Sequence, residues 1–136
     1  MAIADAGTIE AERPAWEGLL GRDEHGPYLV GARCASCRAL SLGLRDLCPN
    51  CWRRNTLQPV SIGRTGRVYT CTTVHHAPEG IEAPFAVGYV DIEEGVRVFA
   101  HLSEGVGIGA EVALTAARVR RAPDGAWLTG PRYISR

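Results

Sequence analysis

Two Cys-x-x-Cys motifs, Cys34-Ala35-Ser36-Cys37 and Cys48-Pro49-Asn50-Cys51, stand ten residues apart in this chain of 136 residues. Each motif turns tightly enough to aim two sulfur atoms at one point, and the segment between them closes as a short hairpin. The spacing therefore predicts a tetrahedral site for one zinc ion, with four ligands: Cys34, Cys37, Cys48 and Cys51. A closed four-cysteine site leaves no open coordination position, so we expect the metal to stabilise the fold and to do no chemistry. A [4Fe–4S] cluster and a pair of redox disulfides remain as alternatives.

The composition is that of one globular domain, or of a small module attached to a larger one. Hydrophobic residues make up 46% of the chain, in runs too short and too often broken to cross a membrane. The first twelve residues include Asp5, Glu10 and Glu12 and no basic residue, which is unlike a signal peptide. Paired cysteine motifs without an export signal predict a cytoplasmic protein whose thiols stay reduced and free for metal.

Charge is balanced, with fifteen basic residues, all of them arginine, against fifteen acidic residues. Non-specific binding of nucleic acid depends on an excess of basic side chains that neutralise phosphates. We therefore expect no nucleic acid among the partners of this chain, and the short apolar runs predict no membrane partner either.

The N-terminal segment is expected to contain a short helix. Pro14 suits a first helical turn, and Gly21 would end the helix. Between them, one apolar stripe at helical spacing is formed by Trp16, Leu19 and Leu20. So short a helix is unstable alone, so the stripe must pack on the core of this chain or on another subunit. Because the helix would lie outside the modules that follow, we take the stripe as the candidate partner contact.

The remaining sequence predicts β-structure throughout. A strand at 28–33 leads to the first cysteine motif, and 40–44 returns from it. Beyond residue 58, alternating β-branched and apolar residues predict five strands, at 68–75, 85–92, 96–102, 111–120 and 127–134. Glycines at points where a sheet must coil favour a closed five-stranded barrel of the OB type. The predicted fold is mainly β, in three parts: an N-terminal segment with a short helix (1–27), a zinc ribbon (28–58) and an OB barrel (59–136).

This order of parts resembles the DUF35 family of acyl-CoA-associated proteins, which combine a short N-terminal helix, a rubredoxin-like zinc ribbon and an OB barrel. The resemblance is carried by the two cysteine motifs and by two β segments, GRVYTCTTVH at 66–75 and PFAVGYVDIEEGVR at 84–97. The chain is similar to the small subunits of thiolase-type complexes such as benzoylsuccinyl-CoA thiolase. One departure concerns the loop before the second motif, where family ribbons often carry Pro-Pro-Arg and this chain has Leu42-Gly43-Leu44-Arg45-Asp46-Leu47.

The resemblance implies a non-catalytic, zinc-containing accessory subunit of a thiolase-fold acyl-CoA enzyme. The large partner of such a hetero-oligomer supplies the nucleophilic cysteine and the catalytic histidine. The small protein would stabilise that partner and help to seat the CoA ester. The complex would carry out β-ketoacyl-CoA thiolysis, aldol cleavage or acyl transfer.

The residues themselves offer no convincing catalytic pair. Cys71 and His75 share one face of a predicted strand but lie about 13 Å apart, too far for a nucleophile and its base. Cys71 is expected to be a small buried apolar residue, and the chain alone to be inactive. CoA phosphates favour guanidinium partners, so Arg64 and Arg67, at the junction of ribbon and barrel, are the candidate CoA contacts, together with His75.

A nucleic-acid-binding module is the alternative function, because OB barrels stack bases on exposed aromatic rings. The barrel region offers six aromatic residues: Tyr69, Phe85, Tyr89, Phe99, Trp127 and Tyr133. Many of them stand at alternating positions expected of a core, which favours the acyl-CoA complex over nucleic acid.

Overall fold

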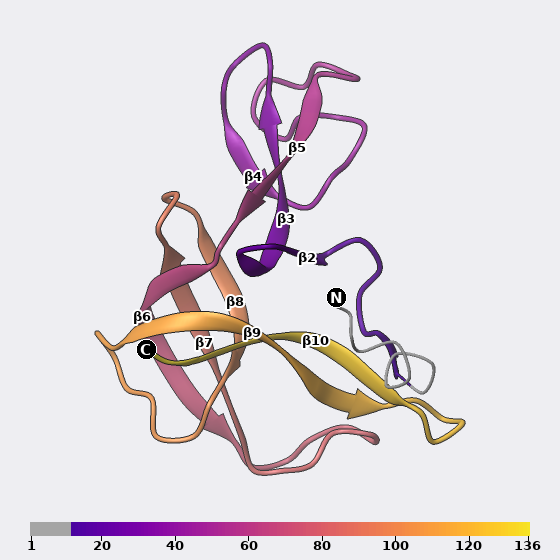
Figure 1. Ribbon diagram of the computed structural model, residues 1–136, viewed down its shortest axis with the longest axis vertical. Helices are drawn as coiled ribbons and strands as arrows, with labels where there is room; N and C mark the ends of the chain where they lie inside the picture. Colours follow the sequence, from indigo (N-terminus) through magenta and orange to yellow (C-terminus); the bar gives the residue numbers. More distant parts are fainter. Residues whose placement is uncertain (1–11) are drawn as a thin grey trace.

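The computed structural model describes residues 12–136, and all the regular secondary structure in that range is β-strand. Figure 1 shows two lobes, a slender ribbon above a barrel. The strands in chain order are β1 (Glu12–Pro14), β2 (Leu20–Asp23), β3 (Gly26–Cys34), β4 (Leu40–Leu42), β5 (Leu57–Ile62), β6 (Thr65–Val74), β7 (Phe85–Ile92), β8 (Arg97–Leu102), β9 (Glu111–Arg121) and β10 (Trp127–Ser135). No helix in this part of the chain is long and apolar enough to cross a membrane.

Five strands close the barrel. They follow the order β10-β8-β7-β6-β9, and an antiparallel pairing of β9 with β10 completes the ring. The contact of β10 with β8 is parallel, through Arg132 opposite His101 and Tyr133 opposite Leu102. The other neighbours in the ring are antiparallel. The predicted five-stranded OB-type barrel is confirmed.

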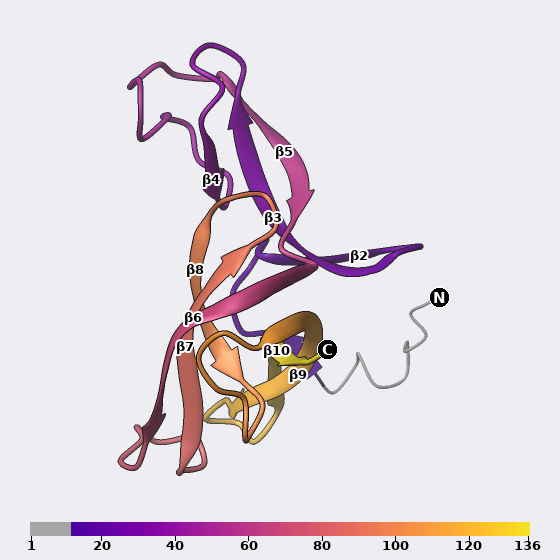
Figure 2. The ribbon, with the colours of Figure 1, turned by 90° about the vertical axis from the view of Figure 1, so that its left-hand side faces the viewer.

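The ribbon is a small antiparallel sheet built around β3. Strand β3 pairs with three other strands, β2, β4 and β5. Its pairing with β5 runs from Leu29 opposite Ile62 to Cys34 opposite Leu57. The antiparallel pair of β3 and β5 rises from the barrel, and the segment between these two strands carries the cysteine motifs at the far end (Figures 1 and 2).

Ribbon and barrel share one apolar core. Leu29 of β3 and Ile62 of β5 are 2% exposed and belong to the same buried cluster as Val90 and Tyr133 of the barrel. Strand β5 thus crosses the predicted module boundary at residue 59. The division into three parts stays a prediction, because the packing runs continuously across it.

The predicted N-terminal helix was wrong. Strand β1 lies parallel to β10, and a turn then leads directly into β2. Gly18, inside the expected helix, has a φ of 71°, which a right-handed helix cannot accommodate. Tertiary contact decided the conformation: the ring of Trp16 lies directly over Gly130 of β10, where even a methyl group would meet it at 2.7 Å.

Candidate metal centre and barrel face

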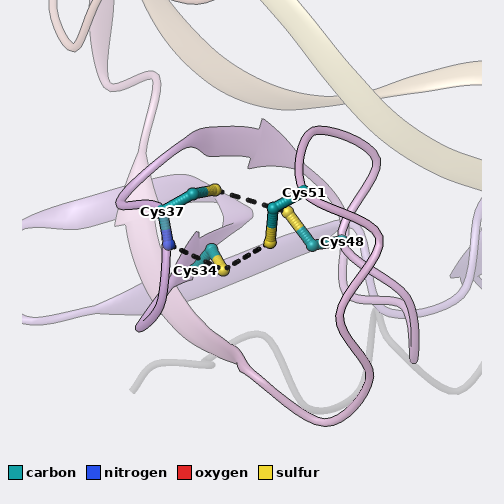
Figure 3. Close-up of side chains that lie close together, drawn as sticks. All are labelled: Cys34, Cys37, Cys48 and Cys51. Atoms are coloured by element: carbon teal, nitrogen blue, oxygen red, sulfur yellow. Dashed lines mark hydrogen bonds between the residues drawn. The ribbon is translucent and has the colours of Figure 1, made fainter.

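The four cysteines of the two motifs converge at the tip of the ribbon (Figure 3). Their Sγ atoms all lie within 4.8 Å of one another. Two pairs that join the two motifs, Cys34 with Cys51 and Cys37 with Cys48, stand 3.7 Å apart. Four sulfur atoms at about 2.3 Å from a central zinc ion would stand about 3.8 Å apart at tetrahedral angles. The cluster could therefore hold a metal ion such as zinc.

The same distances weigh against the two alternatives. In a [4Fe–4S] cluster each thiolate binds a different iron atom, so the sulfur atoms must stand further apart than around one ion. A disulfide brings two sulfur atoms to about 2.05 Å. Distances of 3.7 Å fit neither arrangement, and all five cysteines of the chain are free thiols.

The two motifs repeat the same backbone turn. The N–H of Arg38 donates to the carbonyl of Cys34, and the N–H of Trp52 donates to that of Cys48, both at 2.9 Å. Arg38 and Trp52 follow the last cysteine of each motif and have φ angles of 70° and 66°. This left-handed conformation normally favours glycine, so each turn is held in place against a steric cost.

Hydrogen bonds to sulfur prepare the site for thiolates. The backbone N–H of Cys37 and then the hydroxyl of Thr56 lower the pKa of Cys34 to about 5, because both favour its ionised form. The side-chain amide of Asn50 is the main cause of the lowered pKa of Cys37. Motif spacing did not predict these two polar neighbours, since neither Asn50 nor Thr56 stands at a ligand position.

Cys51 differs from the other thiols. The backbone N–H of Arg53 favours its thiolate, but burial and the three neighbouring thiols outweigh that bond and raise the pKa of Cys51 to about 11. Four negative charges at this spacing require a cation among them. The donor set thus fits a divalent metal ion.

A second feature is a row of aromatic side chains on the outer surface of β6, β7 and β8, here called the aromatic face and made up of Tyr69, Tyr89 and Phe99. Their exposed fractions are 49%, 46% and 61%. Tyr89 and Phe99 touch edge to face, with ring centroids 5.3 Å apart. The expectation that many barrel aromatics stand at core positions does not hold for these three residues, whereas Tyr133 is fully buried.

The sequence contained a signal for this orientation. Along β7 Tyr89 shares its face with Asp91, and along β8 Phe99 shares its face with Arg97. Asp91 and Arg97 form a bidentate ion pair at 2.6 and 3.1 Å, and the guanidinium group also lies 3.4 Å from the centroid of the Tyr69 ring. Each charged residue stands two positions from an aromatic residue and so lies on the same face of its strand. The charges therefore identify that face as the solvent side.

The predicted partner residues divide between the core and this surface. Leu19 and Leu20 are partly buried and pack against the core cluster. Trp16 remains 46% exposed and lines, with Leu19 and Phe99, a hollow of about 280 Å³ beside the aromatic face. Trp16 and Leu19 therefore adjoin that face, while Leu20 does not line the hollow.

The three predicted CoA contacts do not come together. Arg64 binds Oδ2 of Asp23 at 2.6 Å and the carbonyl of Gly26 at 3.0 Å, which ties the start of the barrel to the hairpin of β2 and β3. This ion pair lowers the pKa of Asp23. Arg67 is held by the carbonyl of Gly109 and the carboxylate of Glu111.

His75 follows the last residue of β6, eight residues beyond Arg67, so the two lie about 26 Å apart along the strand. Cys71 was expected to be buried, but it is only half-buried and packs against the core cluster.

Comparison with known proteins gives consistent matches. Residues 59–117 match the family model described as the C-terminal OB-fold domain of ChsH2. The chain is 31% identical over 107 residues to a DUF35 domain-containing scaffold protein of Methanocaldococcus jannaschii, which covers 74% of this chain and 76% of that protein. It is 32% identical over 114 residues to the benzoylsuccinyl-CoA thiolase subunit BbsA of Thauera aromatica, covering 82% and 78% of the two chains. Among solved structures, a chain of an Ltp2-ChsH2(DUF35) aldolase matches with a TM-score of 0.62 and 29% identity, over 79% of this chain and 84% of that one.

Proposed function

Because this chain belongs to the DUF35 family, we propose that it is an accessory subunit of a thiolase-type acyl-CoA enzyme. It docks on a thiolase-fold subunit in the cytoplasm and leaves the bond-breaking chemistry to that partner. The reaction of the complex is thiolysis of a β-ketoacyl-CoA, aldol cleavage or acyl transfer. One relative is named as a thiolase subunit and the solved relative as an aldolase assembly, which supports a partner of this kind.

The aromatic face carries the proposal. Tyrosine and phenylalanine are enriched in protein interfaces, and exposed apolar patches on a small domain commonly mark interaction sites. Asp91 and Arg97 neutralise each other beside these rings, so the surface carries little net charge. An apolar and nearly neutral surface suits a protein partner better than a polyanion. Trp16 and Leu19 extend the contact through their hollow.

The metal in this proposal is one structural zinc ion, held by the four cysteines. Four thiolates complete its coordination, so it would hold the tip of the ribbon in shape and would bind no substrate. The ribbon in turn supports β3 and β5, whose residues reach the barrel core. Zinc would thereby stabilise the surface that meets the partner.

The proposed contact with CoA at Arg64, Arg67 and His75 requires an exchange of partners. Arg64 would have to release Asp23, and Arg67 would have to release Glu111, before either could bind a phosphate. The test is CoA affinity of the complex for Arg64→Ala with Arg67→Ala, beside Asp23→Ala as a matched control. The control breaks the same junction contact but frees the Arg64 guanidinium, so CoA affinity should fall in the first variant and hold or rise in the second. Unchanged affinity in the double variant would reject this contact.

The main experiment isolates the tagged chain from its native host and identifies the co-purifying protein by mass spectrometry. We expect a thiolase-fold subunit in stoichiometric amount. Tyr89→Ser with Phe99→Ser should release that subunit, whereas Ile108→Ser, an exposed apolar residue in the loop before β9, should retain it. A partner of another fold, or equal retention by both variants, would refute the proposal.

A nucleic-acid-binding module is the second candidate, because the aromatic face lies on the strands that OB barrels use to stack bases. It predicts a salt-sensitive gel shift with single-stranded DNA that Tyr89→Ser with Phe99→Ser abolishes. The paired state of Arg64, Arg67 and Arg97 favours the accessory subunit instead.

A further inference from the structure

A pocket of about 620 Å³ lies on the barrel. The end of β6 and the start of β7, which contribute to its wall, lie at the end of the barrel remote from the ribbon (Figure 1). The pocket is bounded by the far end of β6, the start of β7, the end of β8 and the loop that follows β8. Its apolar wall includes Phe85, Leu102 and Val106, and its polar groups include His101 and Arg132. The volume lies within the usual range for small-molecule sites.

Arg132 is the cation of this pocket, and its hydrogen bonds are incomplete. Among residues 12–136 the buried Nε atom has no hydrogen-bond partner, and Nη2 donates to the carbonyl of Arg118 at 3.5 Å. Within residues 12–136 no carboxylate stands within 4.0 Å of Arg132, although Arg64, Arg67 and Arg97 each have one. The one acidic residue of the pocket, Glu104, is exposed and makes no ion pair with Arg132 in that range. Arg132 therefore lines the pocket without a carboxylate partner, and its guanidinium is a candidate site for an oxyanion.

His101 forms the wall beside this cation. Its ring stacks on Phe85, with centroids 5.4 Å apart and planes inclined by 29°. It is the register neighbour of Arg132, and burial, followed by the charge of Arg132, lowers the pKa of His101. The lowered pKa keeps His101 neutral at physiological pH, so Arg132 is the one cation among the residues that line the pocket, next to a flat aromatic wall.

We infer that this pocket binds a small monocarboxylate with an aromatic or branched apolar body. The carboxylate accepts hydrogen bonds from the planar guanidinium of Arg132, whose fork matches two oxygen atoms. The body lies against Phe85, Leu102 and Val106. One guanidinium with a neutral imidazole matches a single negative charge, so a monocarboxylate fits better than a phosphate dianion.

The chain supplies its own reporters for this site. Cys71 lines the pocket and is the one cysteine outside the metal cluster, so on zinc-loaded protein a thiol reagent should label it selectively. His101 is the second reporter, because an anion placed on Arg132 favours the protonated imidazole. The probes are benzoate, benzyl alcohol as an uncharged analogue, and inorganic phosphate as an anion without an apolar body.

The experiment follows the rate of Cys71 alkylation by iodoacetamide and the pKa of His101 by NMR, on the zinc-loaded full chain. We expect benzoate to slow alkylation and to raise the pKa of His101, and the two other probes to do neither. Arg132→Gln should weaken benzoate binding about tenfold, while the matched variant Arg120→Gln, an exposed arginine on β9, should not change it. Equal protection by benzyl alcohol would show an apolar hollow without an anion site, and equal effects of phosphate would show an adventitious ion only. Either result would overturn the inference, and so would the absence of any effect of benzoate. The measurements with the three probes use the unmodified chain, so they remain decisive even if a variant fails to fold.

Discussion

The hydroxyl group of Tyr133 donates a 2.7 Å hydrogen bond to the carbonyl oxygen of Gly63. Gly63 joins the ribbon strand β5 to the barrel strand β6 and has a φ of 76°. Its own N–H donates to the carboxylate of Glu94, in the turn between β7 and β8, at 3.0 Å. Burial and the charge of Glu94 raise the pKa of Tyr133, so its hydroxyl remains a donor at every physiological pH. Two barrel residues, Tyr133 and Glu94, thus hold the backbone of Gly63 at the point where ribbon and barrel join.

Replacing Tyr133 by Phe should destabilise the protein by about 1–3 kcal/mol, because the buried carbonyl of Gly63 loses its donor. Urea unfolding of the zinc-loaded chain measures the change. Tyr89→Phe is the control, since the Tyr89 side chain is exposed, and it should change the stability by less than about 0.5 kcal/mol. Equal stabilities for the two variants would remove the role assigned to this hydrogen bond.

Cys51→Ser should lower the bound zinc well below one equivalent and release the tip of the ribbon, because binding of the metal and local folding are one equilibrium. Hydrogen exchange should accelerate across residues 34–56 more than in β7 and β8. The matched control is Cys71→Ser, which removes the fifth cysteine and should keep the zinc. Full zinc content in Cys51→Ser, or iron in place of zinc in the unmodified chain, would contradict the assignment.

Zinc affinity should rise with pH. In the metal-free cluster the pKa of Cys51 is raised to about 11, so at neutral pH zinc must displace at least the Cys51 proton. Below the Cys34 pKa of about 5 that thiol is protonated as well, and affinity should fall more steeply. Competition with a chelating dye at several pH values measures the slope, and calorimetry in two buffers counts the released protons. An affinity independent of pH near neutrality would contradict a protonated Cys51.

Arg38→Gly should stabilise the zinc-loaded chain by about 0.5–1 kcal/mol. A left-handed residue with a side chain costs about 1–2 kcal/mol, which glycine avoids, although glycine loses more backbone entropy on folding. Arg38→Ala keeps the steric cost at a φ of 70° and should bring no such gain. Thermal unfolding compares the two variants, and a glycine variant no more stable than the alanine variant would show that the turn is not strained.

The cysteine cluster and the barrel were predictable because both leave strong local patterns. Cysteine spacing identified all four clustered thiols, and period-two alternation located β7 at the residues where it is found, Phe85–Ile92. The N-terminal helix failed because helical spacing of three apolar residues is a weak preference, which the pairing of β1 with β10 overrides. No local pattern could show that Arg64 already has Asp23 as its partner, since 41 residues separate them. The pocket at Arg132 was equally hidden, because it depends on the parallel contact of β8 with β10.

Because ribbon and barrel share one continuous core, we expect them to be kept together when genes recombine. A gene break near residue 59 would separate Leu29 from Ile62, its register neighbour, and would uncover the buried side of the barrel at Tyr133. The barrel transferred by itself would need a new apolar residue to fill the place of Leu29. A fragment that begins before β3 and ends after β10 would carry the complete core into a fusion. Recombination that preserves folding should therefore move the zinc ribbon and the barrel together.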